Sequence, residues 1–266
     1  MELTTKQKYL SAAGLLLVAT AAGKGIGAGD KIPLTGLIGG TGRGYFSTAY
    51  TLFMPVHAIT LGAFPVALSG LVSKYRATGD SARVAALQRS ACGLFFWVGL
   101  AGTALMVLLA GPYTRLVAGA PKAIYTVLIL APTALFSAMA AAHRAFAEGH
   151  LNMVPTSVCQ VLEALFKMVF GLLFAKLSMG RLYQIYLDTG MVLGNRAESE
   201  TTALSMMYPV TAACAMLGVT LGALVAWVYA ALYDRFRYPT VCRGSSCPVA
   251  RPESWYGLPC RWWWQR

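Results

Sequence analysis

The stretch YFSTAYTLFMPVHAITLGAFPVALSGLVS, residues 45–73, decides the fold, because it contains no Asp, Glu, Lys or Arg. Residues 201–233 form a second stretch without any of these four residues. A hydrocarbon core about 30 Å thick is crossed by roughly 20 apolar residues in a helix, so each stretch is long enough to span a bilayer. Lipid offers no hydrogen bonds to the backbone, and the spanning segments must therefore be helices.

The composition agrees with a membrane protein. Of 266 residues, 57% are hydrophobic and only 12% are charged, and the mean hydropathy is +0.57. Soluble domains carry about 25% charged residues. The formal charge of +12 comes from Lys and Arg placed mainly between apolar stretches, which suits contact with lipid headgroups better than binding of nucleic acid. We therefore expect a multi-pass cell membrane protein with membrane lipid, not nucleic acid, as its surroundings.

The apolar pattern predicts an all-α bundle of about six transmembrane helices within residues 1–235. The predicted spans are residues 9–27, 45–72, 90–109, 123–142, 153–177 and 201–233. The first span is expected to be retained, because no convincing signal-peptide cleavage site follows it. Residues 236–266 show no helical or strand period, and we interpret them as a disordered or out-of-frame tail.

The distribution of basic residues favours a cytoplasmic amino terminus. That orientation places on the cytoplasmic side the residues Lys6, Lys8, Lys74, Arg76, Arg83, Arg89, Arg144, Arg235 and Arg237. The opposite side then holds Lys24, Lys31, Arg43, Arg115, Lys122, Lys176, Arg181 and Arg196. If Lys24, Lys31 and Arg43 face a water-filled cavity instead of a loop, the excess on the cytoplasmic side becomes decisive.

Motifs of soluble-type catalysis do not occur in the chain. Its glycine-rich stretches, residues 23–29 and 39–44, lack the phosphate-loop pattern, and no H-E-x-x-H or G-x-S-x-G sequence is present. The six cysteines have no paired C-x-x-C spacing. The sequence therefore predicts no enzyme, no metal site and no cofactor.

Charged residues inside the predicted spans carry the functional information, since such groups face a cavity or a partner. Glu163 and Lys167 lie at i and i+4, so they form either a structural ion pair or part of a site for substrate or protons. Lys24 either extends to the membrane interface or faces a cavity that binds an anion. For the turn between spans that carries Arg144, Glu148 and His150, we expect solvated side chains.

Small residues predict close helix packing. Gly23 with Gly27, and Gly218 with Gly222, have the small-xxx-small spacing at which membrane helices approach one another.

Three stretches resemble a known family. One comprises residues 31–34 (KIPL), 37–40 (LIGG) and 44–50; the most specific is AFPVALSGLVSKYRATGD at 63–80; the third is NMVPTS at 152–157, followed by Gln160, Glu163 and Lys167. Together they are similar to the stage V sporulation protein B group of polysaccharide exporters. That group belongs to the multidrug/oligosaccharidyl-lipid/polysaccharide exporter superfamily. The resemblance covers about residues 5–235. It departs at 144–149, where RAFAEG stands in place of the family's RGYFQG.

The resemblance implies a transporter. Family members are built from two helical bundles around a central cavity, and this chain supplies the amino-terminal one. They are flippases, which implies translocation of a lipid-linked oligosaccharide or peptidoglycan precursor across the cytoplasmic membrane by alternating access, in cell-wall synthesis or sporulation. In this chain we expect Lys24, Lys31, Arg43 and Lys167 to form a cationic wall for the substrate, with Glu163 positioning Lys167. A second six-helix lobe or a homodimer would complete the pathway.

Two other functions remain open. A drug/cation antiporter of the same superfamily would need carboxylates within the membrane, of which the sequence suggests only Glu163. The third alternative is a membrane fragment that inserts but transports nothing.

Overall fold

The computed structural model describes residues 5–192, 195–196 and 199–238 of the chain. The predicted tail, residues 236–266, lies almost wholly outside the described residues. Five helical runs within the described part are long and apolar enough to cross a membrane. The predicted all-α membrane fold is therefore confirmed, and the chain is a multi-pass membrane protein.

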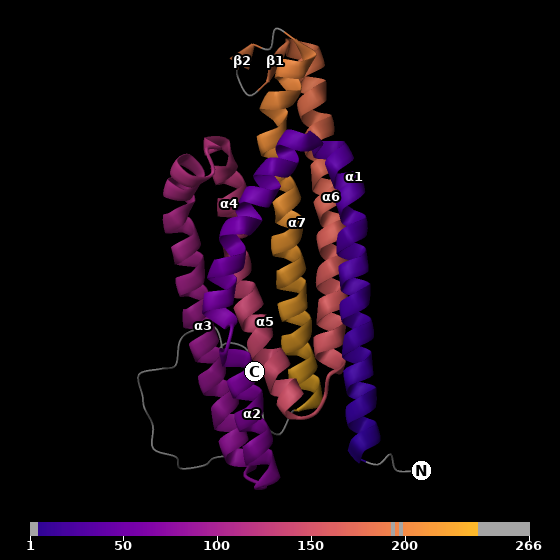
Figure 1. Cartoon of the computed structure of the whole chain (residues 1–266), viewed down its shortest axis with the longest axis vertical. Coiled ribbons are helices and arrows are strands. Elements are labelled where there is room, and N and C mark those ends of the chain that lie inside the picture. Colours follow the sequence, from indigo (N-terminus) through magenta and orange to yellow (C-terminus); the bar gives the residue numbers. More distant parts are fainter. Residues whose placement is uncertain (1–4, 193–194, 197–198, 239–266) are drawn as a thin grey trace.

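The first of these runs makes two passes. Helix α1 (Thr5–Leu61) continues into α2 (Phe64–Ala77) across a break at Gly62 and Ala63. The run Gly14–Ala77 contains 64 residues, which at 1.5 Å per residue is about three times the thickness of the hydrocarbon core. A kink at Gly39 divides α1. In Figure 1 the chain rises to this kink and then descends toward α2.

Only glycine fits at the kink. Gly39 has φ 65° and ψ 177°, a combination that L residues with a side chain avoid. A Cβ atom at this position would also lie 2.8 Å from Cζ of Tyr208. The glycine-rich segment that could be taken for a connector is therefore a helix with one sharp bend.

The remaining elements continue the up-and-down order seen in Figure 1. They are α3 (Ser81–Pro112), the π-helical turn η1 (Tyr113–Val117), the 3-10 turn η2 (Pro121–Ala123), α4 (Ile124–Leu130), α5 (Pro132–Gly149), α6 (Val154–Thr189), the strands β1 (Met191–Val192) and β2 (Asn195–Arg196), and α7 (Glu200–Arg237). The two strands pair as an antiparallel hairpin between α6 and α7.

The described helices thus make six passes, as expected, but the predicted boundaries were too short. Helix α1 continues through the expected connector, α3 begins at Ser81, and α5 runs to Gly149. The start of α3 is set by Asp80, whose side chain accepts a hydrogen bond from the backbone N–H of Arg83 at 3.0 Å. We call the end that holds the α2–α3 junction and the α5–α6 turn the basal end, and the end that holds Gly39 the apical end.

Glycines bring α6 and α7 into backbone contact. A Cβ atom on Gly218 would lie 2.3 Å from the backbone nitrogen of Gly171. One on Gly222 would lie 2.9 Å from the carbonyl oxygen of Glu163 and 3.3 Å from the backbone nitrogen of Lys167. The packing role predicted for Gly218 and Gly222 is confirmed. Of the other pair, a Cβ atom on Gly23 would lie 3.7 Å from the carbonyl oxygen of Gln160 on α6, whereas one on Gly27 would have no such neighbour within 4 Å.

We predict that Gly218→Ala destabilises the protein by about 1–3 kcal/mol, because the new methyl group overlaps backbone and not a movable side chain. The measurement is thermal unfolding in detergent. The matched control is Gly180→Ala, where no atom lies within 4 Å of the added Cβ and helix propensity makes the change neutral or mildly stabilising. Equal melting temperatures of the two variants would contradict the close α6–α7 contact.

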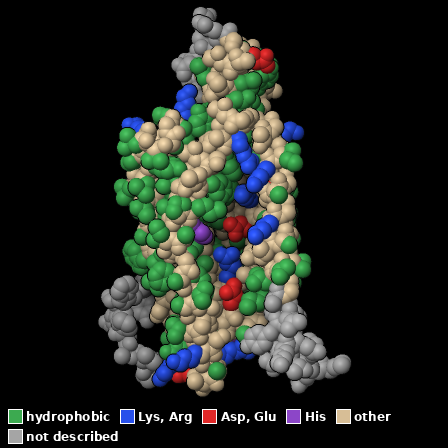
Figure 2. Space-filling model, viewed as in Figure 1, with side chains coloured by type: hydrophobic (Ala, Val, Ile, Leu, Met, Phe, Trp, Pro, Cys, Tyr) green, Lys and Arg blue, Asp and Glu red, His purple; other side chains and the backbone are tan. Residues whose placement is uncertain are grey.

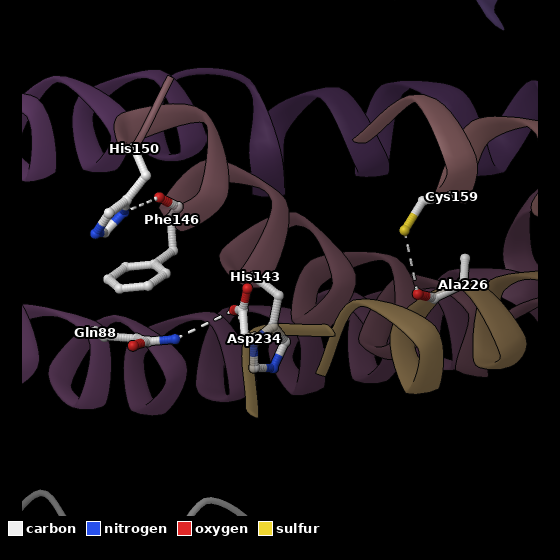
Figure 3. A network of polar contacts seen from close by, with 7 residues as sticks. All are labelled: Gln88, His143, Phe146, His150, Cys159, Ala226 and Asp234. Atoms are coloured by element: carbon white, nitrogen blue, oxygen red, sulfur yellow. Dashed lines mark hydrogen bonds and ion pairs between the residues drawn. The ribbon is translucent and has the colours of Figure 1, made fainter. Parts of the chain in front are cut away.

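A buried polar network joins three helices near the basal end (Figure 3). Asp234 of α7 is 1% exposed. Its Oδ2 atom lies 2.9 Å from Nδ1 of His143 on α5, and it accepts a hydrogen bond from Nε2 of Gln88 on α3 at 3.2 Å. A buried carboxylate is stable only when its neighbours satisfy it. The network therefore fixes the end of α7 against α3 and α5.

Asp234→Ala should destabilise the protein by about 3 kcal/mol, since it leaves the imidazole of His143 and the amide of Gln88 buried without their shared acceptor. Asp188→Ala, at an exposed position on α6, is the control and should change stability by less than about 0.5 kcal/mol. Both are measured by chemical denaturation in detergent. A loss at Asp234 no larger than at Asp188 would remove the proposed anchoring role.

Candidate functional site

Charged side chains gather along a hollow on one face of the bundle. Figure 2 shows basic, acidic and histidine side chains in a vertical band between apolar surfaces. The charged residues that interact with one another in this part of the bundle come from α1, α5 and α6. We call it the polar groove and define it by Asp30, Arg43, Tyr50, His57, Arg144, Glu163 and Lys167, which are linked by the contacts and electrostatic interactions described below.

Lys167 crosses the groove to α1. Its Nζ atom lies 4.9 Å from the centroid of the Tyr50 ring, within the range of a cation–π interaction. Of the two alternatives for Glu163 and Lys167, the structural ion pair is not formed, because the ion pairs closer than 4.0 Å among the described residues do not include them. The ammonium group of Lys167 lies at the ring of Tyr50 instead. Glu163 remains half-buried in the groove.

Asp30 is the acidic residue that the sequence analysis missed. It is 6% exposed, and it interacts electrostatically with Lys167 and Arg43. Within the described residues its Oδ1 atom has no hydrogen-bond partner. The predicted first span ends at Gly27, which leaves Asp30 in the connector between spans. The sequence feature that could have identified Asp30 is its spacing of seven residues from Gly23, which places both residues on the face of α1 that meets α6.

The predicted cationic residues divide into two groups. Arg43 and Lys167 are half-buried and share Asp30 as a neighbour, and the guanidinium carbon of Arg43 lies 6.0 Å from the Phe46 ring centroid. Lys24 and Lys31 are exposed on α1. Lys24 lines a shallow recess together with Leu16, Leu17, Thr20 and Ala21 of its own helix. Asp30 interacts electrostatically with Arg43 and Lys167, and Tyr50 interacts with Lys167 and Glu163. Neither Lys24 nor Lys31 takes part in these described interactions.

His57 and Arg144 were also missed as groove residues. The Nδ1 atom of His57 lies 3.4 Å from Oγ of Ser137 on α5, and its ring stacks on Phe53 at 5.1 Å between centroids. His57 interacts electrostatically with both Glu163 and Arg144.

The expected solvated turn at Arg144, Glu148 and His150 is wrong, because α5 continues to Gly149. Arg144 and Glu148 are half-buried on this helix, and Glu148 accepts a hydrogen bond from Thr156 at 2.8 Å. His150 follows the last turn, where its Nδ1 atom lies 2.9 Å from the carbonyl oxygen of Phe146. The extended helix therefore turns Arg144 toward the groove.

The charge of the groove is positive. Arg43, Arg144 and Lys167 give three positive charges against the two negative charges of Asp30 and Glu163, before any charge on His57. An isolated charge at the centre of a bilayer costs several kcal/mol, so these groups require water or an oppositely charged ligand beside them. The groove is therefore suited to hold an anionic group at membrane depth. Within the described part of the chain, no group of three or more His, Cys, Asp or Glu residues could hold a metal ion.

If the groove contains water, cysteines placed in it will be reactive. In a variant with the native cysteines replaced, we expect Glu163→Cys and Lys167→Cys to react with a charged, water-soluble thiol reagent at least roughly tenfold faster than Leu165→Cys, because a thiolate forms only where water can solvate it. Leu165 lies on the same helix and is 37% exposed, on the side away from the groove. Labelling is followed by mass spectrometry in lipid nanodiscs. Similar rates at the three positions would mean that the groove is dry.

Comparison with known proteins identifies relatives of the chain. Residues 10–188 match the model of the polysaccharide biosynthesis protein family. The chain is 26% identical over 174 residues to the lipid II flippase MurJ of Bacillus subtilis, an alignment that covers 61% of this chain and 31% of that protein. It is 25% identical over 158 residues to the stage V sporulation protein B of the same organism, covering 59% of this chain and 30% of the relative. The chain thus matches about a third of the length of each relative. No solved structure matches it.

Proposed function

Because the chain belongs to the polysaccharide biosynthesis protein family, we propose that it forms one bundle of a flippase for a lipid-linked oligosaccharide or peptidoglycan precursor. The single observation that carries the proposal is the cationic groove, in which Arg43, Arg144 and Lys167 are half-buried on three helices long and apolar enough to cross a membrane. A lipid-linked sugar carries its charge on the phosphate or pyrophosphate between lipid and sugar. The groove compensates that charge while the lipid chain stays in the hydrocarbon.

The arrangement of the groove supports a site that opens to exchange its ligand. Asp30 neutralises part of the charge on Lys167 and Arg43 in the unliganded state, which lowers the cost of holding two cations in the membrane. An arriving phosphate replaces this carboxylate as the partner of the two cations. In the proposed cycle, the bundle then rocks against a second bundle around this fixed site and exposes it to the other side of the membrane.

Lys24 and Lys31 support the presence of that second bundle. Both are exposed on α1 and lie between the basal start of the helix and the kink at Gly39. Lys24 lies 15 residues before Gly39, about 22 Å along the helix, and is too deep to be left facing lipid. We propose that a second six-helix lobe, or a second copy of this chain, covers this side and that Lys24 and Lys31 extend the cationic wall.

The alternative of a drug/cation antiporter gains little support. Asp30 adds a second carboxylate to Glu163, but the basic residues of the groove still outnumber the acidic ones. An organic cation would meet net repulsion there. The choice between a transporting bundle and an inactive one depends on the partner that covers the groove.

The proposal is tested by binding of undecaprenyl pyrophosphate to the full chain in lipid nanodiscs, measured by native mass spectrometry. We expect Arg43→Gln combined with Lys167→Gln to weaken binding by at least about tenfold, because two charge-assisted contacts to the pyrophosphate are lost. The uncharged alcohol undecaprenol should bind both proteins equally weakly.

The matched control removes two exposed basic groups near the apical end, as Arg115→Gln with Lys122→Gln. This control lowers the net charge of the protein by the same amount and should leave the affinity within about twofold of the unmodified chain. Loss of affinity in the control as large as in the groove variant would mean that bulk charge, and not the groove, attracts the lipid. Unchanged affinity in the groove variant would overturn the proposed site.

A further inference from the structure

One face of the descending half of α1 carries a row of aromatic rings. The row follows the spacing 3, 4, 3, 4 that keeps side chains on one helix face, and it comprises Arg43, Phe46, Tyr50, Phe53 and His57. The ring centroids of Phe46 and Tyr50 are 5.3 Å apart, and those of Tyr50 and Phe53 are 6.2 Å apart. Those of Phe53 and His57 are 5.1 Å apart. The rings therefore form a continuous stripe, which we call the aromatic stripe.

The neighbouring rings fix the ring of Tyr50. Phe46 and Phe53 are 8% and 7% exposed, and both belong to the apolar core against which Tyr50 packs. They lie one turn before and one turn after Tyr50 on the same face of α1. Tyr50 itself is half-buried. Its ring is thus anchored in the core while part of it stays open to the groove.

Lys167 of α6 meets this ring with its ammonium group. The Nζ atom lies 4.9 Å from the Tyr50 ring centroid, and no carboxylate of the described residues lies within 4.0 Å of Nζ. An aromatic ring attracts a cation through the negative charge at its face, although the ring has no net charge. A carboxylate in this place would cancel the charge of Lys167. The ring instead holds the ammonium group and leaves its positive charge available to a ligand.

The cation at the other end of the stripe has a similar neighbour. The guanidinium carbon of Arg43 lies 6.0 Å from the ring centroid of Phe46, at the outer limit of a cation–π interaction. Phe46 and Tyr50 are adjacent rings, one helical turn or about 5.4 Å apart along α1. The stripe thus places a cation from α1 and a cation from α6 on neighbouring rings.

We propose that Tyr50 is a positioning residue, whose ring holds the ammonium group of Lys167 where the polar groove binds an anionic group. This role of Tyr50 rests on the proposed anion site. A lysine side chain without such a contact has many rotamers, and an arriving anion has to order it at a cost in affinity. The ring orders Lys167 before the anion arrives, and no proton is transferred and no bond is broken in the process.

The test varies the charge at the ring face while keeping the shape of the ring. In the full chain in lipid nanodiscs, Tyr50 is replaced by phenylalanine and by its mono-, di- and trifluorinated forms. All of these lack the Tyr50 hydroxyl, which also interacts with Lys167, so Tyr50→Phe is the reference. Binding of undecaprenyl pyrophosphate is measured by native mass spectrometry. Since fluorine withdraws charge from the ring face, we expect the affinity to fall stepwise, by about 3- to 10-fold over the series.

The matched control is the same fluorinated series at Phe53. This ring lies in the same stripe and contacts Tyr50, but the cation–π pairs among the described residues do not include it. Fluorination at Phe53 should therefore change the affinity by less than about twofold. A flat series at Tyr50, or an equal fall in the two series, would overturn the positioning role.

A second measurement detects the contact in the absence of a ligand. NMR of the chain with lysine labelled by ¹³C at Cε reports the protons next to each ammonium group. The Lys167 signal, identified by its loss in Lys167→Gln, should lie upfield of that of the exposed Lys74, because the ring current of Tyr50 shields it. Tyr50→Leu should abolish this difference. Equal positions of the two signals in the unmodified chain would contradict the contact on which the proposal depends.

The anion site and the role of Tyr50 can be told apart when one of them fails. If Arg43→Gln with Lys167→Gln weakens binding while the series at Tyr50 is flat, the groove binds the lipid and Tyr50 does not position Lys167 for it. If that double variant binds normally, the anion site is wrong and the positioning role falls with it, even where the NMR signal shows the contact between ring and ammonium group.

Discussion

The close approach of α6 and α7 is the contact on which the polar groove depends. Gly171 and Gly218 meet backbone to backbone, and Gly222 lies against the backbone of Glu163 and Lys167. Lipid exerts no hydrophobic pressure between helices, so their association relies on van der Waals contact of this kind. Because α7 holds the backbone side of these two residues, their side chains are directed toward α1. The glycines thus place the charges, although they take no part in the chemistry.

Charge compensation across the groove follows from that placement. Lys167 is held over the ring of Tyr50, and Asp30 stands near both Lys167 and Arg43. The Oδ1 atom of Asp30 has no hydrogen-bond partner in the described residues. The two cations are therefore the neighbours that stabilise a negative charge on this buried carboxyl group. The groove accordingly combines opposite charges that stabilise one another with a positive excess. That excess distinguishes the polar groove from the network at the basal end, where the Oδ2 atom of Asp234 is shared by Gln88 and His143.

The sequence was sufficient to predict the fold but only part of the site. Apolar length indicated six passes, and the glycine spacing at 218 and 222 predicted a packing face that the structure confirms. Of the five residues predicted for the site, Arg43, Glu163 and Lys167 lie in the polar groove, whereas Lys24 and Lys31 are exposed on α1; Asp30, His57 and Arg144, which also lie in the groove, were not predicted. Asp30 and Arg144 were missed for one physical reason: the predicted spans end at Gly27 and Ala142, shortly before these charges, as suits a helix surrounded by lipid. These helices continue because the charged side faces the groove, where opposite charges compensate it. His57 lay inside an apolar stretch, but a single histidine on a helix gives no sign of its partners on α5 and α6.

The kink at Gly39 connects the width of the groove to the apical end. Both halves of α1 border the groove, one through Asp30 and the other through Arg43, Tyr50 and His57. The distance between the two halves of α1 depends on the kink at Gly39, where the chain reverses. Because Gly39 has no side chain, the ring of Tyr208 on α7 can pack against this kink. At the basal end, by contrast, α7 is tied to α3 and α5 through Asp234. Helix α7 therefore contacts the rest of the bundle at three levels. Asp234 binds α3 and α5 at the basal end, and Gly218 and Gly222 pack against α6. Tyr208 packs against the kink at Gly39, between the two halves of α1. A change in the angle at Gly39 would alter the distance between Asp30 and Arg43 without breaking either of the other two contacts.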